Sequence, residues 1–408
     1  MAKTNYPIFS VYGIEMEYMI VDQHSLAIKP LADKLIGTVA GEITNEVACG
    51  EIMLTNELAL HVIELTTNGP KNSLKDLDLI FHERIIELNK LLVPSGAKLM
   101  PTGTHPFFIP DQNVALWPHG DQIIYQTYNK IFNCSGHGWT NLQSVHINLP
   151  FSNDDELKKL HSAIRLILPL IPALAASTPF SEGKLSEALD SRLLHYGQNQ
   201  KLLPIISGDI IPEFIQSEKE YHEKILNPMY HAIAPHDPEK ILQEEWLNSR
   251  GAIARFDRYA VEIRIMDIQE SPLMDISCIS AITAAIKHII QHQSLYLEKP
   301  MATQRLKQIY QDAIYHGMAT LVTDQDYLAQ LGLKPQNAIS MQLIWEKLIG
   351  KSATEIDARH QKGLDFILKN GNLAERLKKH YQSEPHDKTI ADLFNQLCEN
   401  LENNSSFR

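Results

Sequence analysis

Hydrophobic and polar positions alternate in several short segments of the first two thirds of the chain, which is the pattern of half-buried strands. Residues 13–22, GIEMEYMIVD, are apolar and rich in β-branched and aromatic side chains, apart from Glu15 and Glu17. Residues two apart in a strand share a face, so both carboxylates point the same way, about 7 Å apart along the strand. The same reasoning predicts strands over residues 61–67, 98–102, 144–149 and 259–267.

Two longer segments have the periodicity of helices. Residues 73–92 place apolar side chains at helical spacing, with Ser73 as the expected N-cap. A second helix is expected over residues 154–177, kinked by Pro169 and Pro172.

After about Leu273 nearly every segment has the helical period, and the polar residues 402–408 are expected to fray. Strands followed by appended helices predict an α+β fold with an antiparallel or mixed sheet.

Four of the predicted strands carry ionisable groups on one face. Beside Glu15 and Glu17, the other three strands contribute Glu64, His146, and the pair Glu262 and Arg264. Alternation within the last strand places Asp267 on the face opposite Glu262, as a supporting or strand-end residue.

A solvent-facing sheet surface would explain any one of these strands, since antiparallel sheets often show one polar face to water. Taken together, however, the same faces also carry apolar residues such as Met19 and Val62. Carboxylates on a partly apolar face are costly unless they are paired or bind a metal. Because Mg²⁺ prefers carboxylate and phosphate oxygens, we interpret these faces as a site for Mg²⁺ and a nucleotide.

The composition narrows the class of partner. The chain has 408 residues, 44% hydrophobic and 21% charged, with a formal net charge of −12. This is a globular composition, and the charge argues against a nucleic-acid or anionic-membrane surface. Four scattered cysteines, no apolar run of eighteen residues and no apolar segment in the first ten residues predict a reduced, cytoplasmic protein without a signal peptide.

Competing motifs are absent or incomplete. The only GK[ST] sequence, residues 350–352, has Trp345 where a P-loop requires glycine, and it follows a helical segment. The sequence contains no HExxH zinc motif and no GxSxG nucleophile elbow. These observations leave the strand faces as the candidate site.

Several short motifs occur together in one order. They are GIEMEY at residues 13–18, GTHPF at 103–107, QSVHINLP at 143–150, ASTPF at 176–180 followed by DSR at 190–192, and VEIRIMD at 261–267. This series resembles glutamate–cysteine ligase family 2, the bacterial carboxylate–amine ligases related to glutamine synthetase. The resemblance implies a curved, largely antiparallel sheet with helices on its outer face and an active site on its concave face.

The resemblance also implies an activity. In that family, ATP activates the γ-carboxylate of glutamate as an acyl phosphate, which the amine of cysteine then attacks. It implies Mg²⁺ as the cofactor, for which Mn²⁺ can substitute, and ATP as a co-substrate. Residues 1–300 would be the catalytic core, with residues 301–408 a helical region packed on it as one structural unit.

Roles for individual residues follow from the resemblance in the same way. The implied metal ligands are Glu15, Glu17, Glu64, His146 and Glu262. Arg264 would clamp the transferred phosphate, with Arg255 also at the nucleotide, and Arg192 would bind a substrate carboxylate or phosphate. The implied substrate pocket contains Thr104, His105 and Gln143.

Two departures from the family pattern leave the acceptor open. The family's QHxHxG motif has Ser144 and Asn148 here in place of the first histidine and the glycine. The segment before the last motif is rich in arginine, with Arg250, Arg255 and Arg258. These arginines could bind a phosphate or an acidic substrate, or could pair with surface acids.

Four interpretations therefore stand: a ligase that uses cysteine, a ligase with another amino acid or amine as acceptor, a non-catalytic nucleotide-binding relative, and a hydrolase that cleaves amides at the same metal site. The presence of all five implied metal ligands argues against the non-catalytic relative. In each case we expect small-molecule ligands, no nucleic-acid or membrane partner, and a homodimer as a plausible assembly.

Overall fold

One large antiparallel sheet organises the protein, described here by a computed structural model covering residues 5–110, 114–293, 298, 300–334, 336–383 and 389–408. The strand order is β2-β3-β4-β1-β6-β10-β9, and β5 also pairs with β1. The strands are β1 (Gly13–Asp22), β2 (Glu46–Cys49), β3 (Ile52–Asn56), β4 (Val62–Thr67), β5 (Ala97–Met100), β6 (Ser144–Pro150), β9 (Ala252–Arg255) and β10 (Ala260–Asp267). The first strand along the chain is thus a central strand of the sheet.

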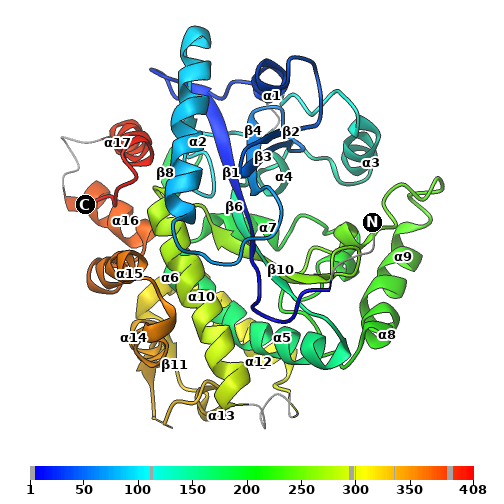
Figure 1. The fold of residues 1–408 in the computed structure, drawn as a ribbon, viewed down its shortest axis with the longest axis vertical. Helices are drawn as coiled ribbons and strands as arrows, with labels where there is room; N and C mark the ends of the chain where they lie inside the picture. Colours follow the sequence, from blue (N-terminus) through cyan, green and yellow to red (C-terminus); the bar gives the residue numbers. More distant parts are fainter. Residues whose placement is uncertain (1–4, 111–113, 294–297, 299, 335, 384–388) are drawn as a thin grey trace.

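Helices cover the apolar face of this sheet. Figure 1 shows α2 (Leu77–Leu92) and α10 (Pro272–His292) running along one side of it, and α5 (Asp154–Ile167) packs against α10. The apolar residues of the strands, such as Ile14 and Ile147, are fully buried in one core with residues of these helices. Alternation then directs the other residues of the same strands to the opposite face.

The remaining elements surround this core. The helices are α1 (Ala32–Ala40), α3 (Gln122–Phe132), α4 (His137–Thr140), α6 (Ile171–Ala175), α7 (Ser191–Tyr196), α8 (Glu218–Tyr221), α9 (Asn227–Ile233), α12 (Thr303–His316), α13 (Gln325–Gln330), α14 (Met341–Lys351), α15 (Ala358–Asn370), α16 (Leu373–Ser383) and α17 (Ile390–Glu402). Short strand pairs are β7 (Phe180–Ser181) with β8 (Lys184–Leu185), and β11 (Leu321–Val322) with β12 (Ile339–Ser340). The C-terminal helices α14 and α15 pack against α10 and so against the back of the sheet.

Helix α10 is long and apolar enough to cross a membrane by length and composition alone. However, 78% of its most apolar window is buried inside the fold, between α2, α5, α14 and α15. It is therefore the central core helix of the protein.

Some element boundaries differ from those predicted. Helix α2 begins at Leu77, and the Ser73 hydroxyl instead accepts a hydrogen bond from the Lys75 amide in the preceding turn, so the expected cap was wrong. The helix over residues 154–177 is interrupted at Leu168–Leu170, as expected from its two prolines. Strands β2, β3 and β9, each four or five residues long, were not predicted.

Strand β10 contains an irregularity that alternation alone could not reveal. Its register against β6 shifts between Ile263 and Met266, which adds one residue to β10. As a result, Asp267 lies opposite Ser144 while Glu262 lies opposite Asn148, and these two pairs share one face of the sheet. The expectation that Asp267 faces away from Glu262 was wrong for this reason.

The last residues of the chain are fixed to the core, against the expectation that residues 402–408 fray. Phe407 is fully buried, and its backbone amide donates a hydrogen bond of 3.0 Å to Glu270. The guanidinium of Arg376 donates to the carbonyl oxygen of Phe407 and, at 2.8 Å, to Glu270. The buried Phe407 side chain and the Arg376–Glu270 ion pair thus hold the segment on the core, although most of its residues are polar.

Replacing Phe407 with alanine should therefore destabilise the fold. Removal of a buried aromatic side chain leaves a cavity, and we expect the free energy of unfolding to fall by about 3 kcal/mol in a urea titration. Leu202→Ala, at a site that is 54% exposed, is the matched control and should change it by less than about 0.5 kcal/mol. Equal stability of Phe407→Ala and the parent protein would mean that the C-terminal segment is not anchored.

Candidate active site

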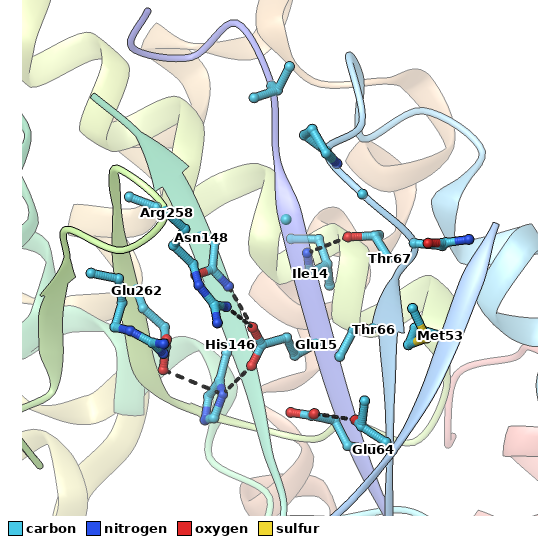
Figure 2. A pocket seen from close by; sticks show the side chains of 18 of the residues that line it. Ile14, Glu15, Met53, Glu64, Thr66, Thr67, His146, Asn148, Arg258 and Glu262 are labelled. Atoms are coloured by element: carbon cyan, nitrogen blue, oxygen red, sulfur yellow. Dashed lines mark hydrogen bonds and ion pairs between the residues drawn. The ribbon is translucent and has the colours of Figure 1, made fainter. Parts of the chain in front are cut away.

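A cavity of about 600 Å³ opens on the polar face of the sheet. Figure 2 shows Glu15, Glu64, His146 and Glu262 projecting into it from β1, β4, β6 and β10. Glu17 is almost fully buried and does not line the cavity, but its carboxylate lies within 4.8 Å of ligand atoms of Glu64 and His146. The five residues that the resemblance implied as metal ligands therefore come together, although they are spread over some 250 positions of the sequence.

The strand register explains this convergence. Glu17 is directly opposite Glu64 across the β1–β4 pair, and Glu15 is directly opposite His146 across the β1–β6 pair. Directly opposed residues on adjacent strands lie close together on the same face. Glu262 enters from the next strand, opposite Asn148.

His146 is at the centre of the group. Its Nδ1 lies 2.8 Å from a carboxylate oxygen of Glu15 and 3.8 Å from one of Glu262, and its Nε2 lies 3.7 Å from Glu17. The side chains form two triads that share this imidazole, namely Glu15–His146–Glu262 and Glu17–Glu64–His146. Within each triad the potential ligand atoms all lie within 4.8 Å of one another.

The carboxylates of this cavity differ in the direction in which their pKa values are shifted. Burial alone would raise the pKa of Glu15, but hydrogen bonds and charge from His146, together with Arg258 and Asn148, lower it to about 2. Burial and the neighbouring carboxylates of Glu15 and Glu57 raise the pKa of Glu64 well above its usual value. One side of the cavity thus holds a stabilised carboxylate, while the other lacks sufficient positive charge.

This donor set suits a hard divalent cation. Carboxylate oxygens with one imidazole are ligands that Mg²⁺ and Mn²⁺ accept, and a bound cation would supply the positive charge that Glu64 lacks. The two triads are the residues that would hold such ions.

Three arginines line the same cavity. The Nε of Arg264 lies 3.0 Å from Glu262, Arg255 donates a 3.3 Å hydrogen bond to the same carboxylate, and Arg258 approaches Glu15 at 3.9 Å. Burial would lower the pKa of Arg264, but Tyr196, Glu262 and Glu17 raise it, so its guanidinium stays charged.

The third arginine of the Arg-rich segment has a different place. Arg250 is buried and forms a two-point ion pair with Glu213, with distances of 2.6 and 2.7 Å. It does not line the cavity.

Arg192 lies outside the residues that line the cavity. It is almost fully buried, and its Nε pairs with Asp267. Burial would lower its pKa, but the charges of Asp267, Asp190 and Glu17 raise it. Asp190 itself caps α7, accepting a hydrogen bond from the Leu193 amide.

Three neighbouring side chains have buried polar atoms without a hydrogen-bond partner in the described part of the chain. They are both amide atoms of Gln143, the Nη2 of Arg192 and the hydroxyl of Tyr196. The pKa of Tyr196 is raised by burial and lowered by Arg264 and Arg192, with Glu262 and Glu17 also acting on it, which places it beside the cavity. Orphaned buried groups of this kind are typical of a site that binds a polar ligand.

Thr104 and His105 are placed elsewhere. The carbonyl oxygen of Thr104 accepts a hydrogen bond from the Thr102 hydroxyl. His105 pairs through Nε2 with the carbonyl oxygen of Leu26 at 2.7 Å, and burial lowers its pKa to about 4. Its ring lines a separate hollow with Phe107, so neither residue reaches the cavity.

Glu57 is a cavity residue that the sequence interpretation missed. It lines the cavity with Thr55 and Glu64, and burial and the charge of Glu17 raise its pKa to about 8. Thr55 donates a 2.5 Å hydrogen bond to Glu64. Residues 53, 55 and 57 share one face of β3 and its extension, so the alternation in this short strand was the signal that could have revealed them.

Asn148 also belongs to the site. Its side-chain amide donates a 2.9 Å hydrogen bond to Glu15, and the Ser144 hydroxyl lies 2.9 Å from the Nε2 of His146. The two residues that depart from the family's QHxHxG motif therefore contact His146 and Glu15, two of the residues that the resemblance implied as metal ligands.

Comparison with known proteins places this geometry in a family. The profile of glutamate–cysteine ligase family 2 matches residues 11–396. An uncharacterized protein of Archaeoglobus fulgidus is 34% identical over 95% of this chain and 96% of its own length. A protein of Rubrobacter xylanophilus, provisionally named glutamate–cysteine ligase 2-3, is 25% identical over 45% of this chain and 48% of its own length.

Two solved structures share the fold. A glutamate–cysteine ligase from Francisella tularensis in complex with AMP superposes with a TM-score of 0.58 at 12% identity, covering 98% of this chain and 90% of its own. A bifunctional glutathione synthetase from Pasteurella multocida gives a TM-score of 0.53 at 14% identity, covering 97% of this chain and 52% of its own. These likenesses confirm the predicted α+β fold with its large antiparallel sheet and C-terminal helices. From the match along almost its whole length, the chain belongs to glutamate–cysteine ligase family 2.

Proposed function

We propose that this protein is an ATP- and Mg²⁺-dependent ligase that joins the γ-carboxylate of glutamate, or a similar acid, to an amine. Family membership supports a carboxylate–amine ligase type of activity. The observation that carries the proposal is the pair of triads sharing His146, flanked in one cavity by Arg255, Arg258 and Arg264. Phosphoryl transfer needs this combination, because negative charge on the nucleotide oxygens must be neutralised and held in place.

The residues divide into a metal-binding group and a phosphate-binding group. Divalent cations held by the two triads would neutralise the phosphate oxygens of ATP. The planar fork of Arg264 faces the same space and suits the oxygens of a transferring phosphoryl group. Arg255 and Arg258 add positive charge at the rim nearest Glu262 and Glu15.

The bond changes balance without a side-chain nucleophile. A carboxylate oxygen of the acid attacks the γ-phosphorus of ATP, and ADP leaves. The amine then attacks the acyl carbon, the carbon–oxygen bond to phosphate breaks, and the amine loses a proton. We propose that the orphaned donors of Arg192, Gln143 and Tyr196 bind the acid beside the metal-ligand group.

The identity of the acceptor is the finer part of the proposal. The proteins of Rubrobacter xylanophilus and Francisella tularensis carry the name glutamate–cysteine ligase, whereas Ser144 and Asn148 here take places that the family motif gives to other residues. We propose a primary amine of an amino acid, cysteine first among them, and a cytoplasmic location.

The direct test is ADP formation by the purified protein with ATP and Mg²⁺, screened over glutamate and related acids crossed with cysteine and other amines. We expect ADP release that requires one acid and one amine together. Amide cleavage without nucleotide would identify a hydrolase, and nucleotide binding without ADP release for any pair would identify a non-catalytic relative.

Replacing either Glu15 or Glu262 with glutamine removes one charge from the metal-ligand group and preserves side-chain shape. We expect the affinity for Mg-ATP, measured by calorimetry, to fall at least about tenfold in each variant. Glu87→Gln changes an exposed carboxylate that pairs with Arg84 and is the matched control. Parent-like affinity in both site variants would exclude these residues as metal ligands.

Arg264→Lys keeps the positive charge but loses the planar fork. We expect turnover to fall by about 100-fold while the midpoint of thermal unfolding changes little. Arg305→Lys, at an exposed pair with Asp324, provides the comparison for a surface arginine. Turnover equal to that of the parent would argue against a phosphate contact by Arg264.

A further inference from the structure

Asp267 is a buried carboxylate with an unusually complete set of partners. One oxygen accepts hydrogen bonds from the amide of Ser177 at 2.9 Å, its hydroxyl at 3.1 Å, and the hydroxyl of Thr178 at 3.2 Å. The other oxygen pairs with the Nε of Arg192. The strand irregularity in β10 turns Asp267 onto the face that also carries Glu262, opposite Ser144 of β6.

The pairing with Asp267 leaves one end of Arg192 unused. Asp267 engages the Nε of the guanidinium, while Nη2 is buried and has no hydrogen-bond partner in the described residues. A buried guanidinium has a fixed orientation once one edge is held, because it is planar. Arg192 thus presents a pre-oriented donor that the protein itself does not satisfy.

The same network reaches Gln143 through Gly103. The amide of Gly103 donates a 2.9 Å hydrogen bond to the hydroxyl of Ser177, and its carbonyl oxygen accepts one of 2.8 Å from the amide of Gln143. A Cβ at position 103 would lie 2.8 Å from Asp267 Cγ and 3.0 Å from Arg192 Cδ, so only glycine allows this approach. Both amide atoms of the Gln143 side chain are also buried and have no hydrogen-bond partner among the described residues.

We propose that Asp267 is a positioning residue for recognition of the acid substrate. It fixes the guanidinium of Arg192 directly and the backbone of Gln143 through Ser177 and Gly103. The unpartnered donors of these two side chains then form a site for a carboxylate of the acid. This inference rests on the proposed function and adds a residue that touches neither the substrate nor the metal. Displacement of a recognition group by as little as about 1 Å can lower a rate by about 100-fold, so a residue that only positions such a group can still change the rate strongly.

A purely structural ion pair would behave differently. Breaking such a pair would lower the free energy of unfolding and would change KM for the acid and KM for ATP to a similar extent. A positioning role affects the acid more than ATP, because the hydrogen bonds of Asp267 go to Ser177, Thr178 and Arg192. The guanidinium of Arg264 instead pairs with Glu262 and donates to the carbonyl oxygen of Asn248. The two roles can therefore be separated by comparing KM for the two substrates.

The test is a double-mutant cycle with Asp267→Asn, Arg192→Lys and the double variant, measured by ADP release and by binding of the acid in calorimetry. We expect each single change to raise KM and Kd for the acid by about tenfold or more, with KM for ATP changed less than about twofold. If Asp267 acts through Arg192, the double variant should be no worse than the poorer single variant.

Two variants that leave Asp267 and Arg192 unchanged keep the inference testable if Asp267→Asn folds poorly. Ser177→Ala removes the hydroxyl that links Gly103 to Asp267. The methyl group added by Gly103→Ala would crowd the Asp267–Arg192 ion pair without changing any charge. Both should raise KM for the acid more than KM for ATP. Asp78→Asn is the matched control, since Asp78 is fully buried and pairs with Arg359 behind the sheet, and it should lower stability only.

The outcomes separate this inference from the proposed function. Additive effects in the cycle, or equal changes in KM for acid and ATP, would overturn the positioning role while leaving the ligase activity intact. A parent protein that neither binds nor consumes any acid of the panel would overturn both. Selective, non-additive loss of acid binding would establish the role of Asp267.

Discussion

Mutual repulsion among the glutamates on one half-buried face is the constraint on which the rest of the structure depends. Two carboxylates about 4 Å apart repel by about 4 kcal/mol at an effective dielectric constant of about 20. The fold opposes Glu17 directly to Glu64 and adds Glu15, Glu57 and Glu262 nearby. Such an arrangement persists only if other interactions hold the strands together and if cations neutralise the cluster.

The apolar side of the same sheet supplies the first requirement. Residues that alternate with the glutamates are fully buried against α2, α5 and α10, so the strand register cannot slip to relieve the repulsion. The imidazole of His146 and three arginines meet part of the second requirement. The raised pKa of Glu64 and of Glu57 shows where positive charge is still lacking, and this is where we propose that divalent cations and ATP bind.

The sequence predicted the parts of this arrangement that depend on regular alternation. Long strands such as β1 and β10 revealed which ionisable residues share a face, because a two-residue period assigns their faces directly. The interpretation of these residues as metal ligands came from the family resemblance. Glu57 was not predicted as a site residue, because β3 is too short to show a clear two-residue period. Asp267 was misplaced because an extra residue in β10 reverses the alternation, and only the pairing with β6 reveals it. Phe407 and His105 depend on tertiary contacts with distant segments, which no local pattern encodes.

We propose that ATP transfers phosphate to a carboxylate of the acid at the cavity, and this step can be followed by the transfer of a labelled oxygen atom. The acid that supports ADP release, beginning with glutamate, would be labelled with ¹⁸O in its side-chain carboxylate, and the phosphate formed would be examined by mass spectrometry. We expect one ¹⁸O atom in each phosphate released, because the acyl phosphate breaks at its carbon–oxygen bond. Amide formation with unlabelled phosphate, or with the label in AMP, would contradict it.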